Sequence, residues 1–126
     1  MLTSVLTEKA PQPGGHYSQA IIHNGLVYIS GQLPIDPLTG EKRLGTIEEQ
    51  AQLALNSLGE ILKASGSALP KVLKTTVYIS DMELWGRVNT VYAQFFGEHR
   101  PARSVVPTKT LHFGFQIEID AIAAIE

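Results

Sequence analysis

The chain has 126 residues, 44% of them hydrophobic and 17% charged, a balance typical of one compact globular domain over residues 1–126. Its net charge of −2 gives no overall attraction to nucleic acid or anionic membranes, and it has no cysteine for disulfides, thiolate catalysis or cysteine-ligated metals. The sequence contains neither a recognisable secretory signal nor an apolar run long enough for a membrane helix, so we expect a cytoplasmic protein.

The first third of the chain predicts short strands. Runs compatible with strands occupy residues 2–7, 18–23 and 26–30. Asn24-Gly25 separates the last two runs, and this dipeptide favours a type I′ turn, which needs positive φ at both central residues. We therefore expect a β-hairpin here, after the proline- and glycine-rich loop at 9–15.

Two helices are predicted by capping signals and apolar stripes. Thr46 and Glu49 have the spacing of a capping box at the start of a helix over 46–65. Its apolar residues recur with helical period: Ile47, Ala51, Ala54, Leu55, Leu58, Ile61 and Leu62. The capping spacing recurs at Ser80, which predicts a second helix that runs to about Phe96.

The remaining strand candidates complete an α+β pattern. They lie at residues 72–80, 104–110 and 116–125, so the element order is β-β-β-α-β-α-β-β. Each helix has one apolar stripe, so both should cover the same face of a mixed six-stranded sheet, as in a two-layer domain. We expect the other face to be apolar as well and to pack against further copies of the chain. The residues that suggest this second surface are Ile22, Val27, Ile29, Val77 and Ile79.

Two charged residues are notable in the C-terminal strands. Arg103 opens an otherwise apolar run after Pro101 and Ala102, and its planar guanidinium is suited to grip a carboxylate with two parallel hydrogen bonds. An ordinary surface or interface ion pair would also explain it. Glu118 alternates with apolar residues and shares its strand face with Asp120, which indicates either a solvated face or a carboxylate at a pocket wall.

Four further residues are candidates for a pocket. Asn89 lies among aromatic residues on one helical face, where its amide either caps nearby backbone groups or points into a polar pocket. Tyr17 follows a glycine pair and is either a packed loop aromatic or a pocket lid. Ser30 and Gly31 do not form a GxSxG nucleophile motif. The glycine would instead let a ligand approach the backbone, while the serine supplies a hydroxyl.

The sequence predicts no metal or cofactor site. The histidines lack zinc-ligand spacing, and they are His16, His23, His99 and His112. Neither a Walker loop nor a GxGxxG motif is present. The lysines and arginines are scattered, without the interleaved aromatic residues of a nucleic-acid groove.

Several segments together form a recognisable pattern. They are YSQAI (17–21), VYISGQLPIDPLTG (27–40), GEILKASG (59–66), VLKTTVYISDM (72–82), VNTVYAQFF (88–96), PARS (101–104) and IEIDAIA (117–123). The most specific part is PARS followed some fifteen residues later by IEIDAIA. From about residue 15 to residue 124, the chain resembles the Rid (YjgF) family of enamine/imine deaminases.

The resemblance implies a fold, an assembly and an activity. The fold would be a chorismate-mutase-like α+β domain, and the assembly a homotrimer whose sheets form a central barrel, with active sites in clefts between subunits. The activity would be hydrolysis of 2-iminobutanoate and 2-iminopropanoate, or their enamine tautomers, to 2-keto acids and ammonia. The resemblance also implies that no cofactor is needed. The expected binding partner is a small 2-imino or 2-keto acid.

The resemblance also implies roles for individual residues. Arg103 matches the arginine that binds the substrate carboxylate, and Glu118 matches the glutamate that positions or activates water. If the two lie close, the arginine should also keep the glutamate ionised. The residues that match the family's pocket are Tyr17, Ser30, Gly31, Asn89 and Val105.

The chain departs from the family pattern at three places. Val105 stands where many members have cysteine, so it would have to act through its backbone carbonyl. Pro107 interrupts a strand run and implies an edge or a bulge. LHFGF (111–115) replaces the more usual leucine-proline-lysine-glycine turn and puts substrate identity in question.

Two other functions are compatible with the same residues. The trimer could hold a keto acid or amino acid as a non-catalytic sensor. It could also act on RNA, since some relatives carry descriptions as ribonucleases or translation inhibitors. The acidic charge balance and the lack of a His/His or His/Lys catalytic pattern weigh against RNA.

Overall fold

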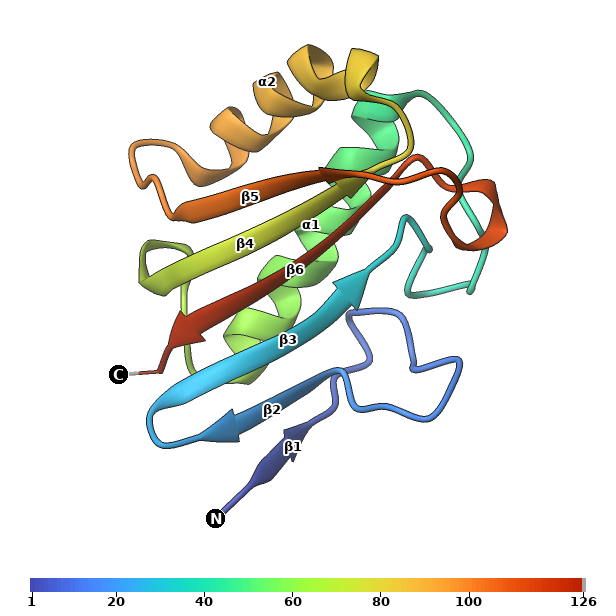
Figure 1. Cartoon of the computed structure of the whole chain (residues 1–126). Helices are drawn as coiled ribbons and strands as arrows, with labels where there is room; N and C mark the ends of the chain where they lie inside the picture. The colour runs from blue at the N-terminus through green and yellow to red at the C-terminus, as the bar shows by residue number, and fades with distance from the viewer. Residues whose placement is uncertain (126) are drawn as a thin grey trace.

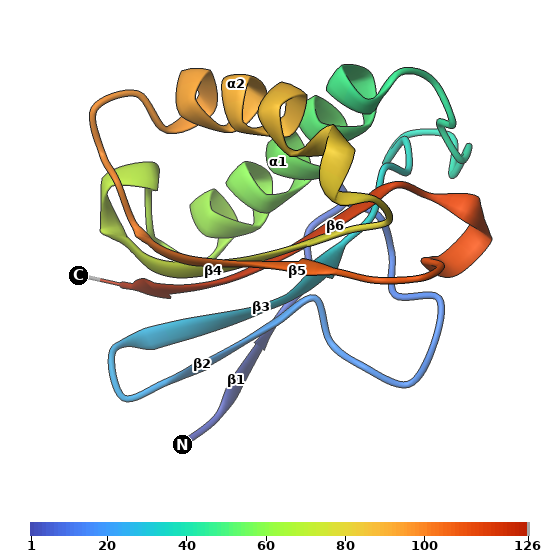
Figure 2. The same cartoon turned by 45° about the horizontal axis from the view of Figure 1, so that its top comes forward.

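A computed structural model describes residues 1–125, which form one sheet with two α-helices packed on it (Figures 1 and 2). The strands are β1 (Thr3–Val5), β2 (Ala20–His23), β3 (Leu26–Gln32), β4 (Val72–Ile79), β5 (Ala102–Pro107) and β6 (Ile117–Ala124). The helices are α1 (Ile47–Ala64) and α2 (Trp85–Phe96), with short 3₁₀ turns at Leu69–Lys71, Met82–Leu84 and His112–Gly114.

The sheet has six strands in the order β1-β2-β3-β6-β4-β5. All neighbours are antiparallel except β4 and β5, which run parallel, so the sheet is mixed as expected. The C-terminal strand β6 lies between β3 and β4, and β1 and β5 form the edges. The expected α+β two-layer fold is therefore confirmed, with both helices on one face (Figure 2).

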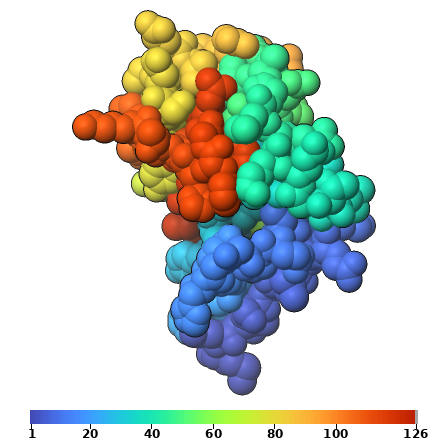
Figure 3. Space-filling model, turned by 90° about the vertical axis from the view of Figure 1, so that its right-hand side faces the viewer, coloured from blue at the N-terminus to red at the C-terminus, as the bar shows by residue number. Residues whose placement is uncertain are grey.

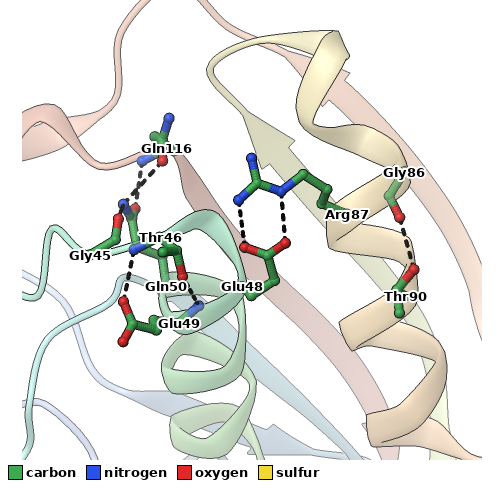
Figure 4. Close-up of polar contacts among 9 residues, drawn as sticks. All are labelled: Gly45, Thr46, Glu48, Glu49, Gln50, Gly86, Arg87, Thr90 and Gln116. Carbon is green, nitrogen blue, oxygen red and sulfur yellow. Dashed lines mark hydrogen bonds and ion pairs between the residues drawn. The ribbon is translucent and has the colours of Figure 1, made fainter.

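The predicted hairpin and the first helix form for the reasons that the sequence indicates. Asn24 and Gly25 have φ of 52° and 77°, as a type I′ turn requires. At the start of α1, the Thr46 side chain accepts a hydrogen bond from the Glu49 backbone, and the Glu49 carboxylate accepts one from the Thr46 backbone (Figure 4). Ser65 is the C-cap of this helix, and Gly66 follows with φ of 81°.

Two local predictions about the second half of the chain were wrong. Asp81, rather than Ser80, caps the segment before α2, because its side chain accepts from the Glu83 backbone and a 3₁₀ turn precedes the α-helix. Strand β5 begins at Ala102, so Arg103 lies inside it instead of before it. Pro107 ends β5 at the sheet edge, where its missing N–H costs no ladder hydrogen bond, as expected.

The core lies between the sheet and the two helices, and the second sheet face differs from our expectation. Val27, Ile29, Val77 and Ile79 are buried in this core, so the prediction that they form a second apolar surface was wrong. The alternate residues of the same strands face away from the helices and are mixed in character: Tyr28, Thr76, Tyr78, Glu118, Asp120 and Ile122. Within residues 1–125, no helix is both long and apolar enough to cross a membrane.

Candidate active site

The carboxylate of Glu118 lies directly against Gly31. Strand β6 pairs with β3 through an irregularity between Ile29 and Gln32, which brings Gly31 beneath the Glu118 side chain. A Cβ atom at position 31 would coincide with the Glu118 carboxylate. Glycine is therefore needed at this position because it leaves room for the acid, and both residues were predicted pocket residues.

The surroundings of Glu118 favour its protonated form. Partial burial raises the pKa of Glu118, the negative charge of Asp120 raises it further, and His112 opposes this shift. Tyr78 pairs with Glu118 across β4 and β6, and burial and the two carboxylates raise the pKa of its phenol. A carboxyl whose pKa is raised above its ordinary value is suited to accept and return a proton.

A cleft of about 520 Å³ opens beside Gly31, and we call it the loop-end cleft. The segments that line it come from the loop before β2, the turn after β3 and the loop before β6, which gather at one end of the sheet (Figure 3). Among its lining residues are Pro11, Tyr17, Gly31, Ile35, His112 and Phe113. It combines an apolar lining with nearby titratable groups, as small-molecule sites commonly do.

Tyr17 and Ser30 are both held by backbone contacts near this cleft. Tyr17 is 53% exposed, and its hydroxyl accepts a hydrogen bond of 3.3 Å from the Gly14 backbone. The Ser30 hydroxyl donates to the carbonyl of Ser18 at 2.7 Å, which ties β3 to the loop that carries Tyr17. Ser30 therefore positions the cleft wall, and its oxygen can still accept a hydrogen bond.

Arg103 lies at a second hollow, of about 550 Å³, beside α2. Its guanidinium donates to Asn89 Oδ1 at 3.0 Å. The same group lies 4.5 Å from the ring centroid of Trp85 and 4.8 Å from that of Tyr92. No ion pair among residues 1–125 includes Arg103. Asn89 and the two rings thus hold an exposed cation whose charge is not balanced by a carboxylate of the described chain.

Within one chain, Arg103 and Glu118 lie on opposite faces of the sheet. Arg103 is the register partner of buried Thr75 and contacts α2, whereas Glu118 alternates with buried Ile117 and Ile119 and points away from the helices. We expected Arg103 to keep Glu118 ionised if the two residues lie close together. Within one chain they do not, and the raised pKa of Glu118 agrees with this separation.

The predicted pocket residues thus fall into two groups. Tyr17 and Gly31 line the loop-end cleft, with Ser30 and Glu118 beside them, and Asn89 accompanies Arg103 at the second hollow. Val105 is partly buried, and its side chain packs against the core, so only its backbone is left to meet a ligand at the sheet edge.

Two buried glutamines that hold loops near the site were missed by the sequence analysis, and one of them, Gln19, lines the loop-end cleft. Gln19 is 1% exposed, accepts from the Thr7 backbone at 2.8 Å and donates to the Pro11 carbonyl at 2.9 Å, which organises the loop before β2. Gln50 donates to the Gly45 carbonyl and accepts from the Gln116 backbone (Figure 4). It therefore joins the loop before α1 to the loop before β6. Each glutamine stands in an ordinary strand or helix pattern, so no local signal marks it.

Replacing Gly31 by alanine should separate folding from site geometry. The added Cβ must displace the Glu118 carboxylate, which is the end of a flexible side chain, so we expect the melting temperature to change little. If Glu118 acts in catalysis, kcat/KM should fall about 100-fold, because a misplaced group of this kind loses alignment. Gly86→Ala is the matched control, since nothing lies within 4 Å of a Cβ at that helical position. Equal activity in both variants would show that the position of Glu118 does not matter.

Comparison with known proteins identifies the family. A family model described as Endoribonuclease L-PSP matches residues 7–125. A RutC family protein of Pyrococcus horikoshii is 46% identical over 119 residues, which cover 94% of each chain. A Rattus norvegicus protein named 2-iminobutanoate/2-iminopropanoate deaminase is 43% identical over 119 residues, covering 94% of this chain and 87% of the relative.

Solved structures agree with the sequence relatives. The crystal structure of E. coli TdcF with bound serine superposes with a TM-score of 0.94 at 35% identity, covering 98% of this chain and 99% of the other. The crystal structure of yeast Mmf1 superposes with a TM-score of 0.96 at 36% identity over 100% of both chains. Sequence and fold therefore lead to one conclusion: the chain belongs to the Endoribonuclease L-PSP family, also known as the YjgF/Rid family.

Proposed function

We propose that this protein hydrolyses small, reactive 2-imino acids and their enamine tautomers to 2-keto acids and ammonia. Relatives at about 43% identity are named 2-iminobutanoate/2-iminopropanoate deaminase, which supports this class of reaction. Two observations carry the proposal. Glu118 is a partly buried carboxyl beside the loop-end cleft, and Arg103, on the opposite face of the sheet, has no carboxylate partner among residues 1–125.

The residues suit a hydrolysis that needs only acid–base chemistry. Arg103 binds the substrate carboxylate with its guanidinium fork and so fixes the imine carbon. Glu118 takes a proton from water as the oxygen adds to that carbon, forming a carbinolamine. The acid then returns the proton to the amino group. Glu118 next carries the hydroxyl proton to the nitrogen, the C–N bond breaks, and ammonia leaves as the C–O bond becomes the carbonyl of the 2-keto acid.

The two halves of the proposed site come from neighbouring copies of the chain. A small imino acid cannot contact Arg103 and Glu118 of one chain together, because they lie on opposite faces of the sheet. A homotrimer in which the sheets surround a central axis would bring the β5 edge of one subunit to the loop-end cleft of the next. Arg103, Asn89 and the Val105 backbone would then face Glu118 and Tyr17 across the interface.

The pH dependence of kcat/KM should reflect the ionisation of Glu118 and the influence of its neighbour Asp120 on β6. Glu118 acts as a base only when ionised, so kcat/KM should fall at acidic pH as this carboxylate becomes protonated. Burial and Asp120 raise the pKa of Glu118, whereas Arg103 of a neighbouring copy would lower it. Asp120→Asn removes a negative charge that raises this pKa, so the acid limb of the profile should move to lower pH. The measurement is kcat/KM against pH for both proteins. An unchanged acid limb would mean that another group controls the rate.

A coupled deaminase assay tests the proposal. A serine/threonine dehydratase generates the enamine in situ, and semicarbazide traps whatever imine remains. We expect the protein to suppress the trapped product and to speed 2-keto acid release. Unchanged trapping together with tight 2-oxobutanoate binding would instead establish a non-catalytic sensor. Salt-sensitive cleavage of RNA that is lost in Arg103→Ala would support the ribonuclease alternative.

A further inference from the structure

Thr75 is a polar side chain that lies within the core. It belongs to strand β4 and is fully buried, with 0% of its surface exposed. Its hydroxyl lies 2.7 Å from the hydroxyl of Tyr92 on α2, which is itself only 6% exposed. Valine and phenylalanine would fill the same space, and replacing both partners of a buried hydrogen bond by apolar groups of the same shape can be nearly neutral for stability. A role other than packing would explain why both hydroxyls are present.

The sheet register places this hydroxyl pair beside Arg103. Strands β4 and β5 run parallel, and Thr75 is the register partner of Arg103. The Arg103 guanidinium lies against the Tyr92 ring, with 4.8 Å between its carbon and the ring centroid. Thr75, Tyr92 and Arg103 therefore form a continuous set of contacts from the core to the edge of the sheet.

The contacts of Arg103 with α2 leave one edge of its guanidinium suited to a carboxylate. Trp85, Asn89 and Tyr92 follow one another at helical spacing, so all three meet the guanidinium from one face of the helix. Asn89 accepts its hydrogen bond from Nη1, which occupies one corner of the group. The edge that carries Nε and Nη2 can then offer two parallel hydrogen bonds to a carboxylate. Because an arginine has many rotamers, ordering it before the ligand arrives strengthens binding.

We propose that Thr75 and Tyr92 are positioning residues, whose hydroxyl pair fixes the Tyr92 ring so that the Nε and Nη2 edge of Arg103 is held ready for the substrate carboxylate. This inference rests on the proposed deaminase function. Phe96 packs on the same ring with centroids 4.7 Å apart, but apolar packing alone does not fix the direction of the hydroxyl end. Without the hydroxyl pair, the guanidinium samples more orientations, and the apparent dissociation constant rises as the competent fraction falls.

The test uses Trp85, the only tryptophan of the chain, as a fluorescent reporter beside the guanidinium. Its emission follows the binding of 2-oxobutanoate, and the coupled deaminase assay gives KM and kcat separately. The double variant Thr75→Val/Tyr92→Phe removes both hydroxyls with little change of shape, so it should fold. Thr75→Ser keeps the hydroxyl and loses a methyl group. Thr90→Val is the matched control, because this exposed hydroxyl donates to the Gly86 carbonyl of the same helix (Figure 4).

We expect the double variant to bind 2-oxobutanoate about tenfold more weakly and to show a KM raised by the same factor. Its kcat should stay within about twofold of the wild type, because a bound carboxylate meets the same guanidinium once that group is ordered. Thr75→Ser and Thr90→Val should behave like the wild type.

Three results would overturn the inference alone: equal affinity in all four proteins, no binding of 2-oxobutanoate by the wild type, or a loss of affinity in Thr75→Ser as large as in the double variant. The last result would mean that Thr75 acts by packing. Absence of imine hydrolysis by the wild type would overturn the proposed function instead. The 2-oxobutanoate affinities of the four proteins would still decide whether the hydroxyl pair positions Arg103.

Discussion

Arg103→Ala is expected to lower kcat/KM for 2-iminobutanoate by at least about 100-fold while the protein remains folded. The variant loses a charge-assisted, two-point grip on the substrate carboxylate, and with it the orientation of the imine carbon. Arg103→Lys should recover only part of the activity, because an ammonium keeps the charge but not the planar fork. The semicarbazide assay measures the rate, and the affinity for 2-oxobutanoate measures directly how tightly the site binds a carboxylate.

The matched control for this arginine is Arg87→Ala. Arg87 lies on the same helix as Asn89, but its guanidinium pairs with Glu48 at the protein surface (Figure 4). Because that pair is exposed, its loss should change neither activity nor folding by much. Full activity in a folded Arg103→Ala protein would falsify the assigned role.

Mixing two inactive variants should restore activity. Arg103→Ala and Glu118→Gln each remove one half of the proposed site, and the two halves are expected to belong to different subunits. When equal amounts are unfolded and refolded together, half of the subunits supply an intact arginine and half an intact glutamate. About one interface in four then contains both, so about a quarter of the wild-type activity should return.

The mixing experiment has a clear contrary outcome. If Arg103 and Glu118 of the same chain serve one substrate, no subunit in the mixture carries both groups, and the refolded protein stays inactive. Mixing the folded variants without unfolding is the control, because slow subunit exchange should leave that sample inactive. Sedimentation or light scattering on the same samples establishes whether the assembly is the expected homotrimer.

Local sequence signals predicted the secondary structure where short-range physics decides it. The capping box at Thr46 and the turn at Asn24-Gly25 depend on neighbours within a few residues, and both form as predicted. The apolar stripe of α1 likewise needs only helical period. The prediction that Ser80 caps the second helix was wrong, because Asp81 caps the segment one residue later and a 3₁₀ turn precedes the α-helix.

The sequence by itself determined the two-layer α+β fold, the main helix and turns, the family and the list of candidate residues. Only the tertiary structure decided how these residues are grouped. Strand order is set by pairing between distant segments, which no local period encodes, and it places β6 against β3 so that Glu118 covers Gly31. The same pairing turns Arg103 toward α2, on the opposite face. Side-chain direction in a strand alternates with each residue, so the sheet register determines which face a charged group occupies.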